Sequence, residues 1–465
     1  MKALHAAAAA GERYLASIDT DRVRRPEADR AAMSLRATFP EEGDGALVAI
    51  DELIRASDGA LRSSGPRFFH WVVGGTTPSA LAADWLTSAW DQSAFAWDSS
   101  PLGSRCEELA MAWLKDLFEL PASWGGVLTT GATMANFTAL AAARRWWAQR
   151  HGVDIDADGF AGLPAVPVLS SGYIHPSATK AFAMLGIGRG TVRRFTRDDV
   201  GRLDATALED ALRALKGAPA IIVGNAGEVN AGDFDPLERM ADLAERYGCW
   251  LHVDGAFGLF ARVTPRAAHL AAGVERAHSV ICDGHKWLNV NYDSGFAFVR
   301  DASLLDNAFA IGAPYLPKPG EHPMFGGRGP EASRRARGIA IWATLRAYGR
   351  AGHRAMVERH LELAQRLARA VDAAPELERL ADVPLNIVCF RYRPGRLAED
   401  ALDTLNAKIG ADLLADGRVY VGTTRYRGHV AFRPAIVNWR TTDADVDLIV
   451  EVVRELAARL AVTVA

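Results

Sequence analysis

Short apolar runs alternate with amphipathic segments from residue 74 onward. Continuous apolar runs suit strands that are buried on both faces, and amphipathic segments suit helices that cover a sheet. The pattern therefore predicts an α/β fold with a mostly parallel central sheet and helices on both faces. The predicted strands are residues 126–129, 166–170, 220–224, 250–254, 279–283 and 296–299. The predicted helices between them include residues 136–149, 205–215 and 236–247.

The two ends of the chain follow different patterns. Residues 1–70 are rich in Ala, Arg, Asp and Glu at helical spacing, which predicts an N-terminal helical arm. Residues 71–340 then form a large domain, and a long helix is predicted over residues 339–360. A second cycle of strands and helices predicts a small C-terminal α+β domain over residues 341–465.

One segment of the large domain is predicted to be a long irregular loop. Residues 314–330 contain five prolines and four glycines. Loops of this length inside compact enzymes often act as lids over a binding site.

Composition narrows the class of protein. A net charge of -3 gives no reason to expect nucleic acid or an anionic membrane as a partner. No apolar run has the length of a membrane span or the form of a secretory signal. The four cysteines are far apart, so we expect buried thiols in a reducing compartment, not disulfides or a metal site. They are Cys106, Cys249, Cys282 and Cys389. The pattern favours a cytoplasmic enzyme.

Two strand ends carry the residues with the most specific chemistry. Lys286 is one of only seven lysines and follows the predicted strand 279–283 in an apolar stretch. Its amine is suited to forming a Schiff base. Asp254 ends the preceding strand and supplies the carboxylate that the ring nitrogen of pyridoxal phosphate requires. An Asp at a strand end also caps turns routinely, but the two successive strand ends together predict a pyridoxal enzyme.

A turn of small residues supplies a candidate phosphate site. Gly131, Ala132 and Thr133 follow the predicted strand 126–129 and open a helix. Small residues there allow backbone N–H groups and the helix dipole to face an anion. The alternative is an ordinary strand-to-helix turn in which Thr133 caps the helix.

Three further residues follow strand ends. His175 is suited to stacking on a flat cofactor ring and to placing a proton donor near a substrate carboxylate, although a histidine here is more often a cap or a surface residue. Asn230 lies in a dense run of turn residues that suggests a backbone close to a ligand, or else a plain loop. Lys180, a rival Schiff-base amine, is predicted to be exposed on a helix.

These motifs together resemble the group II pyridoxal-phosphate-dependent decarboxylases, which include aromatic L-amino acid, glutamate and tyrosine decarboxylases. The resemblance runs from about residue 65 into the C-terminal domain, and its specific pair is His-Val-Asp ending at Asp254 with His-Lys-Trp around Lys286. It implies fold type I of the pyridoxal enzymes, with residues 71–340 as the cofactor-binding domain. It also implies an intertwined homodimer, with the active sites at its interface and an N-terminal arm that wraps the partner.

The resemblance implies roles for individual residues. Lys286 would form the internal aldimine, Asp254 would keep the pyridine nitrogen protonated, and His175 would stack on the ring. Ala256 would pack on the other face, with Ala132 and Thr133 at the phosphate and His285 nearby. Asn230 would contact the phenolic oxygen of the cofactor or the catalytic lysine. The aromatic residues expected to wall the substrate pocket, from the same or the other subunit, are Phe68, Phe69 and Trp71.

The implied reaction is decarboxylation of an L-amino acid. The substrate amine displaces Lys286, carbon dioxide leaves, and the quinonoid is protonated before the amine is released. A tyrosine in the mobile loop commonly assists that protonation in the family, but residues 322–331 contain none, and Phe325 stands at or near its place. Family members with Phe there couple decarboxylation to oxidative deamination and form an aldehyde.

Three alternatives to simple decarboxylation therefore stand. They are oxidative deamination, another fold type I lyase or aminotransferase reaction, and a non-catalytic pyridoxal-binding protein. A second departure is Asp283, where animal members commonly have Asn near the phosphate.

Overall fold

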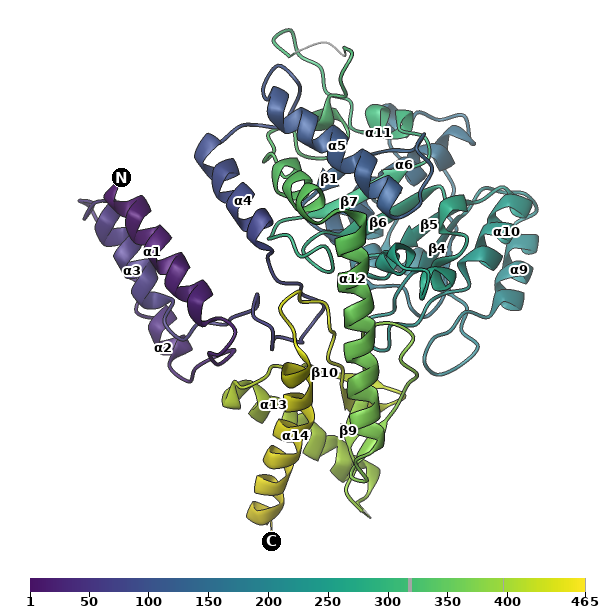
Figure 1. Ribbon diagram of the computed structural model, residues 1–465. Helices are drawn as coiled ribbons and strands as arrows, with labels where there is room; N and C mark the ends of the chain where they lie inside the picture. Colours follow the sequence, from purple (N-terminus) through teal and green to yellow (C-terminus); the bar gives the residue numbers. More distant parts are fainter. Residues whose placement is uncertain (317–319, 396, 465) are drawn as a thin grey trace. The chain divides into compact units, whose positions relative to one another are not determined.

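The computed structural model describes residues 1–316, 320–395 and 397–464. The chain divides into two compact units, Thr76–Arg359 and a second unit made of Met1–Gly75 with His360–Ala465. Figure 1 shows the elements of both units. In the described part of the chain, no helix combines the length and apolarity needed to cross a bilayer.

The unit Thr76–Arg359 is built on a seven-stranded sheet with the order β1-β7-β6-β5-β4-β2-β3. Adjacent strands from β3 through β2, β4 and β5 to β6 pair parallel, whereas β7 pairs antiparallel with both β6 and β1. The mostly parallel sheet predicted from the apolar runs is therefore confirmed. The strands are β1 Gly125–Thr129, β2 Val168–Ser170, β3 Val192–Arg194, β4 Ile221–Asn225, β5 Trp250–Asp254, β6 Ser279–Asp283 and β7 Gly295–Val299.

Helices cover both faces of this sheet, as predicted. Ile221 and Val223 of β4 lie in one apolar cluster with the buried residues of α6, Ala132–Gln149. Alternate residues of a strand face opposite sides, and Gly224 indeed faces α10, Leu237–Tyr247, on the other side. The remaining helices of this unit are α4 Pro78–Trp90, α5 Pro101–Leu117, α7 Ile155–Asp158, α8 Pro176–Met184, α9 Ala205–Ala214 and α11 Ser303–Ala308.

The second unit combines an N-terminal group of helices with a four-stranded antiparallel sheet of order β10-β11-β9-β8. The unit boundary falls inside α12, Gly338–Asp372, which Gly349 kinks at φ 58°. The helices are α1 Lys2–Ser17, α2 Ala28–Ala32, α3 Ala46–Ala56, α13 Glu399–Asp416 and α14 Asp443–Val464. The strands are β8 Leu377–Arg379, β9 Phe390–Tyr392, β10 Thr423–Tyr426 and β11 His429–Phe432.

The sequence pattern missed β3, β8 and β10, and all three are edge strands. In β3 only Val192 is buried, while Arg193 and Arg194 face solvent. A strand with one free edge needs no continuous apolar run, so it leaves little signal in the pattern.

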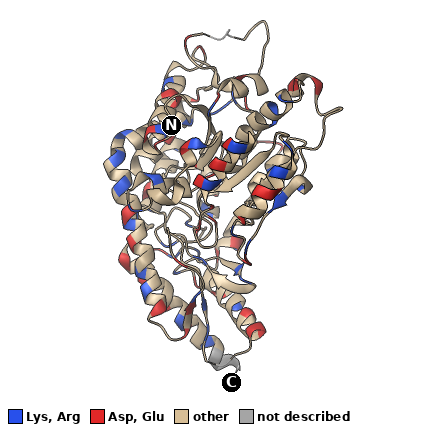
Figure 2. Cartoon of the chain, turned by 90° about the vertical axis from the view of Figure 1, so that its right-hand side faces the viewer, with Lys and Arg blue, Asp and Glu red and all other residues tan. Residues whose placement is uncertain are grey.

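The predicted loop over residues 314–330 is irregular where it is described, except for a short 3-10 helix at Phe325–Gly327. Residues 317–319 of this segment lie outside the described residues. Charged side chains of both signs are interspersed along the helices, as Figure 2 shows.

A buried ion pair ties α5 to β1 and to the segment before α12. Arg334 donates to both carboxylate oxygens of Glu107 at 2.6 and 3.0 Å, and the two side chains are 2% and 0% exposed. Glu107 also accepts the backbone N–H of Leu128 in β1, and Arg334 donates to the Leu128 carbonyl. The pair thereby holds the strand that leads into the α6 turn, and Arg334 donates to the Ala94 carbonyl as well.

Replacing Arg334→Met should lower the free energy of unfolding by about 3–5 kcal/mol, because it leaves a carboxylate buried without its cation. The midpoint of thermal unfolding measures this change. Arg213→Met, which removes an exposed ion pair with Asp210 on α9, is the matched control and should leave the midpoint nearly unchanged. Equal midpoints for Arg334→Met and the unsubstituted protein would contradict the structural role of the pair.

Candidate active site

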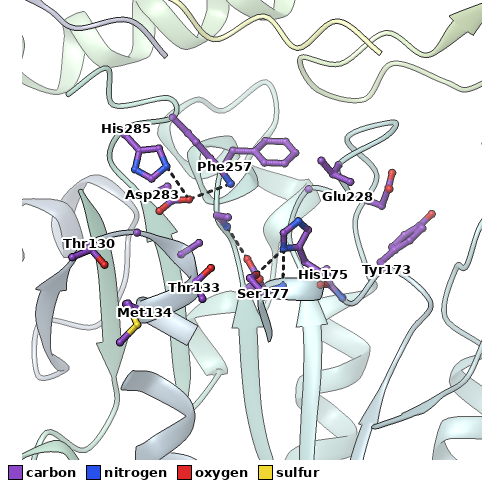
Figure 3. Close-up of a pocket in the computed structure, with 18 residues that line it drawn as sticks. Thr130, Thr133, Met134, Tyr173, His175, Ser177, Glu228, Phe257, Asp283 and His285 are labelled. Carbon is purple, nitrogen blue, oxygen red and sulfur yellow. Dashed lines mark hydrogen bonds and ion pairs between the residues drawn. The ribbon is translucent and has the colours of Figure 1, made fainter. Parts of the chain in front are cut away.

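Five strand ends meet at one cavity of about 340 Å³ in the unit Thr76–Arg359. They are the carboxyl ends of β1, β2, β4, β5 and β6, which lie at one edge of the sheet because these strands run in the same direction. Figure 3 shows the side chains that line the cavity. These are Thr130, Gly131, Ala132, Thr133, Met134, Tyr173, His175, Ser177, Asn225, Gly227, Glu228, Val229, Asp254, Ala256, Phe257, Asp283, His285 and Lys286.

The turn after β6 carries the amine of the site. Lys286 Nζ lies 3.1 Å from Asp283 Oδ2 and 5.8 Å from the centre of the Phe257 ring. His285 Nε2 lies 3.5 Å from the same carboxylate oxygen, and burial lowers the pKa of the imidazole. Asp283 itself is 2% exposed. The amine is thus held by a buried carboxylate at the floor of the cavity.

Asp254 is the last residue of β5 and is 6% exposed. Its Oδ2 accepts a hydrogen bond from Asn136 Nδ2 at 2.9 Å, and its Oδ1 accepts the backbone N–H of Ala256 at 3.2 Å. Donors on both oxygens fix the orientation of the carboxyl plane. The structure therefore presents an oriented carboxylate to the same cavity as Lys286.

His175 is the N-cap of α8 and begins the turn that Pro176 fixes. Its Nδ1 accepts the backbone N–H of Ser177 at 3.2 Å and lies 2.7 Å from Ser177 Oγ. The capping interpretation is confirmed, and the capped ring also lines the cavity, whereas its stacking on a cofactor stays a prediction. Lys180, one turn further along α8, is exposed as predicted.

The N-terminus of α6 faces the cavity with its first turn. The N-cap is Gly131, not Thr133, and within the described residues no side chain caps this helix. A Cβ at Gly295 would lie 2.6 Å from Gly131 Cα, so β7 passes directly against this turn only because residue 295 is a glycine. The first N–H groups of this helix, which no described side chain caps, form a cradle for an anion.

The opposite wall is polar and internally bonded. Tyr173 donates its hydroxyl proton to Asp233 at 2.6 Å, and burial together with that carboxylate raises the pKa of the phenol. Glu228 accepts the backbone N–H groups of Asn230 and Ala231, both at 2.9 Å. These contacts stiffen the loop after β4.

Five of the residues assigned to the site from the sequence do not line the cavity. Asn230 turns its amide onto Glu228, with Nδ2 at 2.5 Å from Oε1. Phe325 is 2% exposed and packs in the apolar core, with Arg334 over its ring at 5.9 Å. Phe68 and Phe69 are buried in the other unit, where Trp71 is 54% exposed. Their contacts with cofactor or substrate stay predictions.

Two residues that the sequence analysis did not assign, Asn136 and Ser177, contact the assigned ones directly. Asn136 Nδ2 bonds Asp254 and lies 3.2 Å from Ser177 Oγ. The available signal was a polar side chain at an inward position of α6, between Ala135 and Ala139, which are both fully buried. Buried polar side chains need partners, so such a position marks a network.

The chemistry of this cavity fits pyridoxal phosphate. The cradle at α6 suits a phosphate, Lys286 supplies an amine, and Asp254 supplies a carboxylate held in place. In the described part of the chain, His285 Nδ1 is buried beside the cradle without a hydrogen-bond partner, 4.0 Å from where a Gly131 Cβ would lie. A bound group that hydrogen-bonds at that point would satisfy it.

Comparison with known proteins gives the same answer. Residues 33–393 match the pyridoxal-dependent decarboxylase conserved domain. The chain is 34% identical to an L-2,4-diaminobutyrate decarboxylase of Rhizobium meliloti (strain 1021), over 91% of this chain and 84% of that protein. It is 29% identical to an aromatic-L-amino-acid decarboxylase of Bacillus atrophaeus, over 86% and 82% of the two chains.

A crystal structure of Oryza sativa TDC with pyridoxal phosphate (PLP) and tryptamine is similar to this chain in fold, with a TM-score of 0.89. The two chains are 26% identical, and the match covers 98% of this chain and 97% of that one. The predicted fold, cofactor and enzyme class are thereby confirmed. Three independent likenesses, in motif, in overall sequence and in fold, lead to one conclusion: the chain belongs to the pyridoxal-dependent decarboxylase family.

Proposed function

We propose that this enzyme removes the α-carboxylate of an L-amino acid, with Lys286, Asp254 and His175 as its catalytic residues. One observation carries the proposal: the amine of Lys286 and the carboxylate of Asp254 line the same cavity as the open N-terminus of α6. All lining residues fall between positions 130 and 286, which supports residues 71–340 as the cofactor-binding domain.

Bound pyridoxal phosphate supplies an electron sink for the bond that breaks. Lys286 would hold it covalently, Asp254 would pair with its ring nitrogen, and Ala132, Thr133 and His285 would bind its phosphate. Ala256 and His175 would pack against its ring. Asp254 suits its role because both of its oxygens already accept hydrogen bonds, which keeps the carboxyl plane fixed.

The remaining steps fall to protein side chains. Asp283, 3.1 Å from Lys286 Nζ, is placed to pair with the amine whenever it is free and protonated. Because Asp283 is 2% exposed, water competes little for that pairing. His175 lines the cavity and is placed to hold a proton near the reacting carbon.

Oxidative deamination is the second candidate function, and one observation favours it. The described residues of the loop 320–331 contain no tyrosine, and Phe325 is buried in the core. Without an acid at that place, dioxygen would compete with a proton for the electrons that remain after carbon dioxide leaves. The substrate, dioxygen and water would then give an aldehyde, carbon dioxide, ammonia and hydrogen peroxide.

We also propose that the enzyme is a homodimer. Exposed apolar side chains on α3, at Leu47, Val48 and Leu53, support this, because a second chain would remove them from water. The same argument applies to Trp85 and Trp90 on α4. The four cysteines are free and buried, which supports a reducing, cytoplasmic compartment.

Borohydride reduction of the holoenzyme should fix the cofactor to the peptide that contains Lys286, as peptide mapping by mass spectrometry will show. Lys286→Ala should abolish the labelling and lower carbon dioxide release by roughly 10³-fold or more, because the amine acts as nucleophile and as leaving group. Lys180→Ala, at the exposed lysine of α8, is the matched control and should retain both. Label on Lys180, or none at Lys286, would refute the assignment.

Incubation with a panel of L-amino acids should release carbon dioxide from one or a few of them. We expect one amine for each carbon dioxide, with neither ammonia nor peroxide, because decarboxylation consumes no oxidant. Amine and peroxide are quantified in the same reactions. Peroxide and ammonia in equal amount to carbon dioxide would instead establish the oxidative reaction.

Sedimentation velocity should give a mass twice that of one chain. Placing a charge on the apolar face, as in Val48→Glu with Leu53→Glu, should shift the protein toward the monomer, because the charges would be buried unpaired in the dimer. Lys216→Glu, on the exposed segment after α9, should leave the dimer intact. A monomeric unsubstituted enzyme would contradict the proposed assembly.

A further inference from the structure

A continuous chain of hydrogen bonds runs behind the cavity and joins β5, β6, α6 and α8. Its two cavity ends are Asp254 and His175, and every link lies within the unit Thr76–Arg359. The residues between and beyond these ends are Asn136, Ser177, His252, Ser279 and Trp250. Because each group can only donate or accept in certain ways, the chain determines where each proton lies.

The deep end of the chain is anchored by groups with a single possible role. Trp250 Nε1 can only donate, and it lies 2.9 Å from Ser279 Oγ. Ser279 Oγ lies 2.8 Å from His252 Nδ1, and His252 Nε2 lies 2.8 Å from Asn136 Oδ1. Complete burial lowers the pKa of His252 to about 4, so near neutral pH the ring has one proton.

The amide of Asn136 decides which nitrogen of His252 holds that proton. Its Nδ2 faces Asp254 Oδ2, which as a carboxylate can only accept, so its Oδ1 faces His252. His252 Nε2 must therefore donate. Its bare Nδ1 then accepts the hydroxyl proton of Ser279.

The Asn136 amide also acts on His175, through the hydroxyl group of Ser177. The second N–H of Asn136 Nδ2 points to Ser177 Oγ at 3.2 Å. Ser177 Oγ thus accepts from Asn136 and directs its own proton to His175 Nδ1 at 2.7 Å. The backbone N–H of Ser177 donates to that same nitrogen at 3.2 Å, a contact that Figure 3 shows beside the hydroxyl contact.

His175 Nδ1 therefore accepts from two donors and cannot hold a proton of its own. The neutral ring must have its N–H at Nε2, on the side of the ring away from Ser177. Without these donors the two neutral tautomers of an imidazole exchange freely, and only one of them places a proton on Nε2.

We propose that Ser177 and Asn136 are positioning residues for His175 and Asp254. The side-chain amide of Asn136 acts on both groups, and the hydrogen bonds that it makes determine where their protons lie. Ser177 fixes His175 as the Nε2–H tautomer. Asn136 keeps Ser177 in its donating role and holds the carboxyl plane of Asp254. The consequence for turnover rests on the proposed decarboxylation, whereas the tautomer is a property of the protein alone.

The tautomer is measured directly by ¹⁵N NMR of the full chain labelled at histidine, with and without cofactor. A His175→Gln sample identifies the His175 signals among those of the 12 histidines. We expect the Nε2–H tautomer in the unsubstituted protein and in Ser177→Thr, which retains the hydroxyl. Ser177→Ala retains only the longer backbone contact to Nδ1, at 3.2 Å, so the Nδ1–H tautomer should appear beside the Nε2–H tautomer.

Asn136→Asp provides a sharper test because it is nearly isosteric. The new carboxyl group shares one proton with Asp254, 2.9 Å away, and its other oxygen still accepts from His252 Nε2, so His252 should keep its tautomer. It cannot donate to Ser177 and instead accepts the Ser177 hydroxyl proton, which removes that proton from His175. We expect the tautomer of His175 alone to change toward a mixture.

Turnover provides the second readout. Ser177→Ala and Asn136→Asp should lower kcat by about 10- to 100-fold, because part of the enzyme then lacks a proton at the required atom. KM should change by less than about threefold, since substrate binding uses other groups. Ser177→Thr should restore most of kcat. Thr138→Val, a buried hydroxyl on the same helix outside the chain of hydrogen bonds, is the matched control and should leave kcat and the tautomer unchanged.

An Nδ1–H tautomer of His175 in the unsubstituted protein would overturn the proposal. So would unchanged His175 signals and unchanged kcat in both Ser177→Ala and Asn136→Asp. Because the NMR experiment needs no substrate, it stands even if no amino acid releases carbon dioxide. Failure of the proposed function and failure of the positioning role are thereby told apart.

Discussion

The parallel pairing of β5 with β6 is the constraint on which the active site depends. Its register places His252 opposite Ser279 and Asp254 opposite Ile281, so both strands end at the same edge of the sheet. Asp254 and the turn that carries Lys286 are brought together by backbone hydrogen bonds, not by contacts between the two side chains. An antiparallel pair would send these two groups to opposite edges.

Around these two strands, hydrogen bonds between buried polar groups offset the free-energy cost of burying them. The carboxylate of Asp254, the amide of Asn136 and the ring of His252 would each be unfavourable alone in the core. Linked in one chain of hydrogen bonds, they satisfy one another and hold each other in one orientation. A rigid site of this kind suits a reaction whose selectivity depends on how the breaking bond of the substrate is oriented.

The site also depends on a close approach between two backbone segments, which a small residue allows. Gly295 lets β7 pass against the turn before α6, which brings the open helix end to the same edge as Lys286. The buried pair of Glu107 and Arg334 fixes β1, the strand that leads into that turn. Strand direction, glycine contacts and one buried ion pair together place a cation, an anion and an anion cradle around a single cavity.

The sequence predicted those parts of this arrangement that depend on the local pattern of apolar and polar residues. Strands β5 and β6 were predicted with the bounds they have, because continuous apolar runs mark strands buried on both faces. Lys286, Asp254 and His175, which all line the cavity, were assigned because each follows such a run. The edge strands β3, β8 and β10 gave no signal, since most of their side chains are not buried.

Contacts between residues far apart in the chain could not be predicted from this local pattern. Asn136 meets its partner Asp254 across 118 positions of the chain, and nothing near either residue encodes that distance. Phe325 shows the converse, because no local feature tells whether an aromatic residue in a loop turns outward or, as here, into the core.

A crystal structure of the holoenzyme tests the central claim most directly. The account predicts electron density for pyridoxal phosphate that is continuous with Lys286 Nζ, with a carboxylate oxygen of Asp254 about 3 Å from the ring nitrogen. Cofactor joined to a different lysine, or seated where Asp254 does not reach its ring nitrogen, would contradict it.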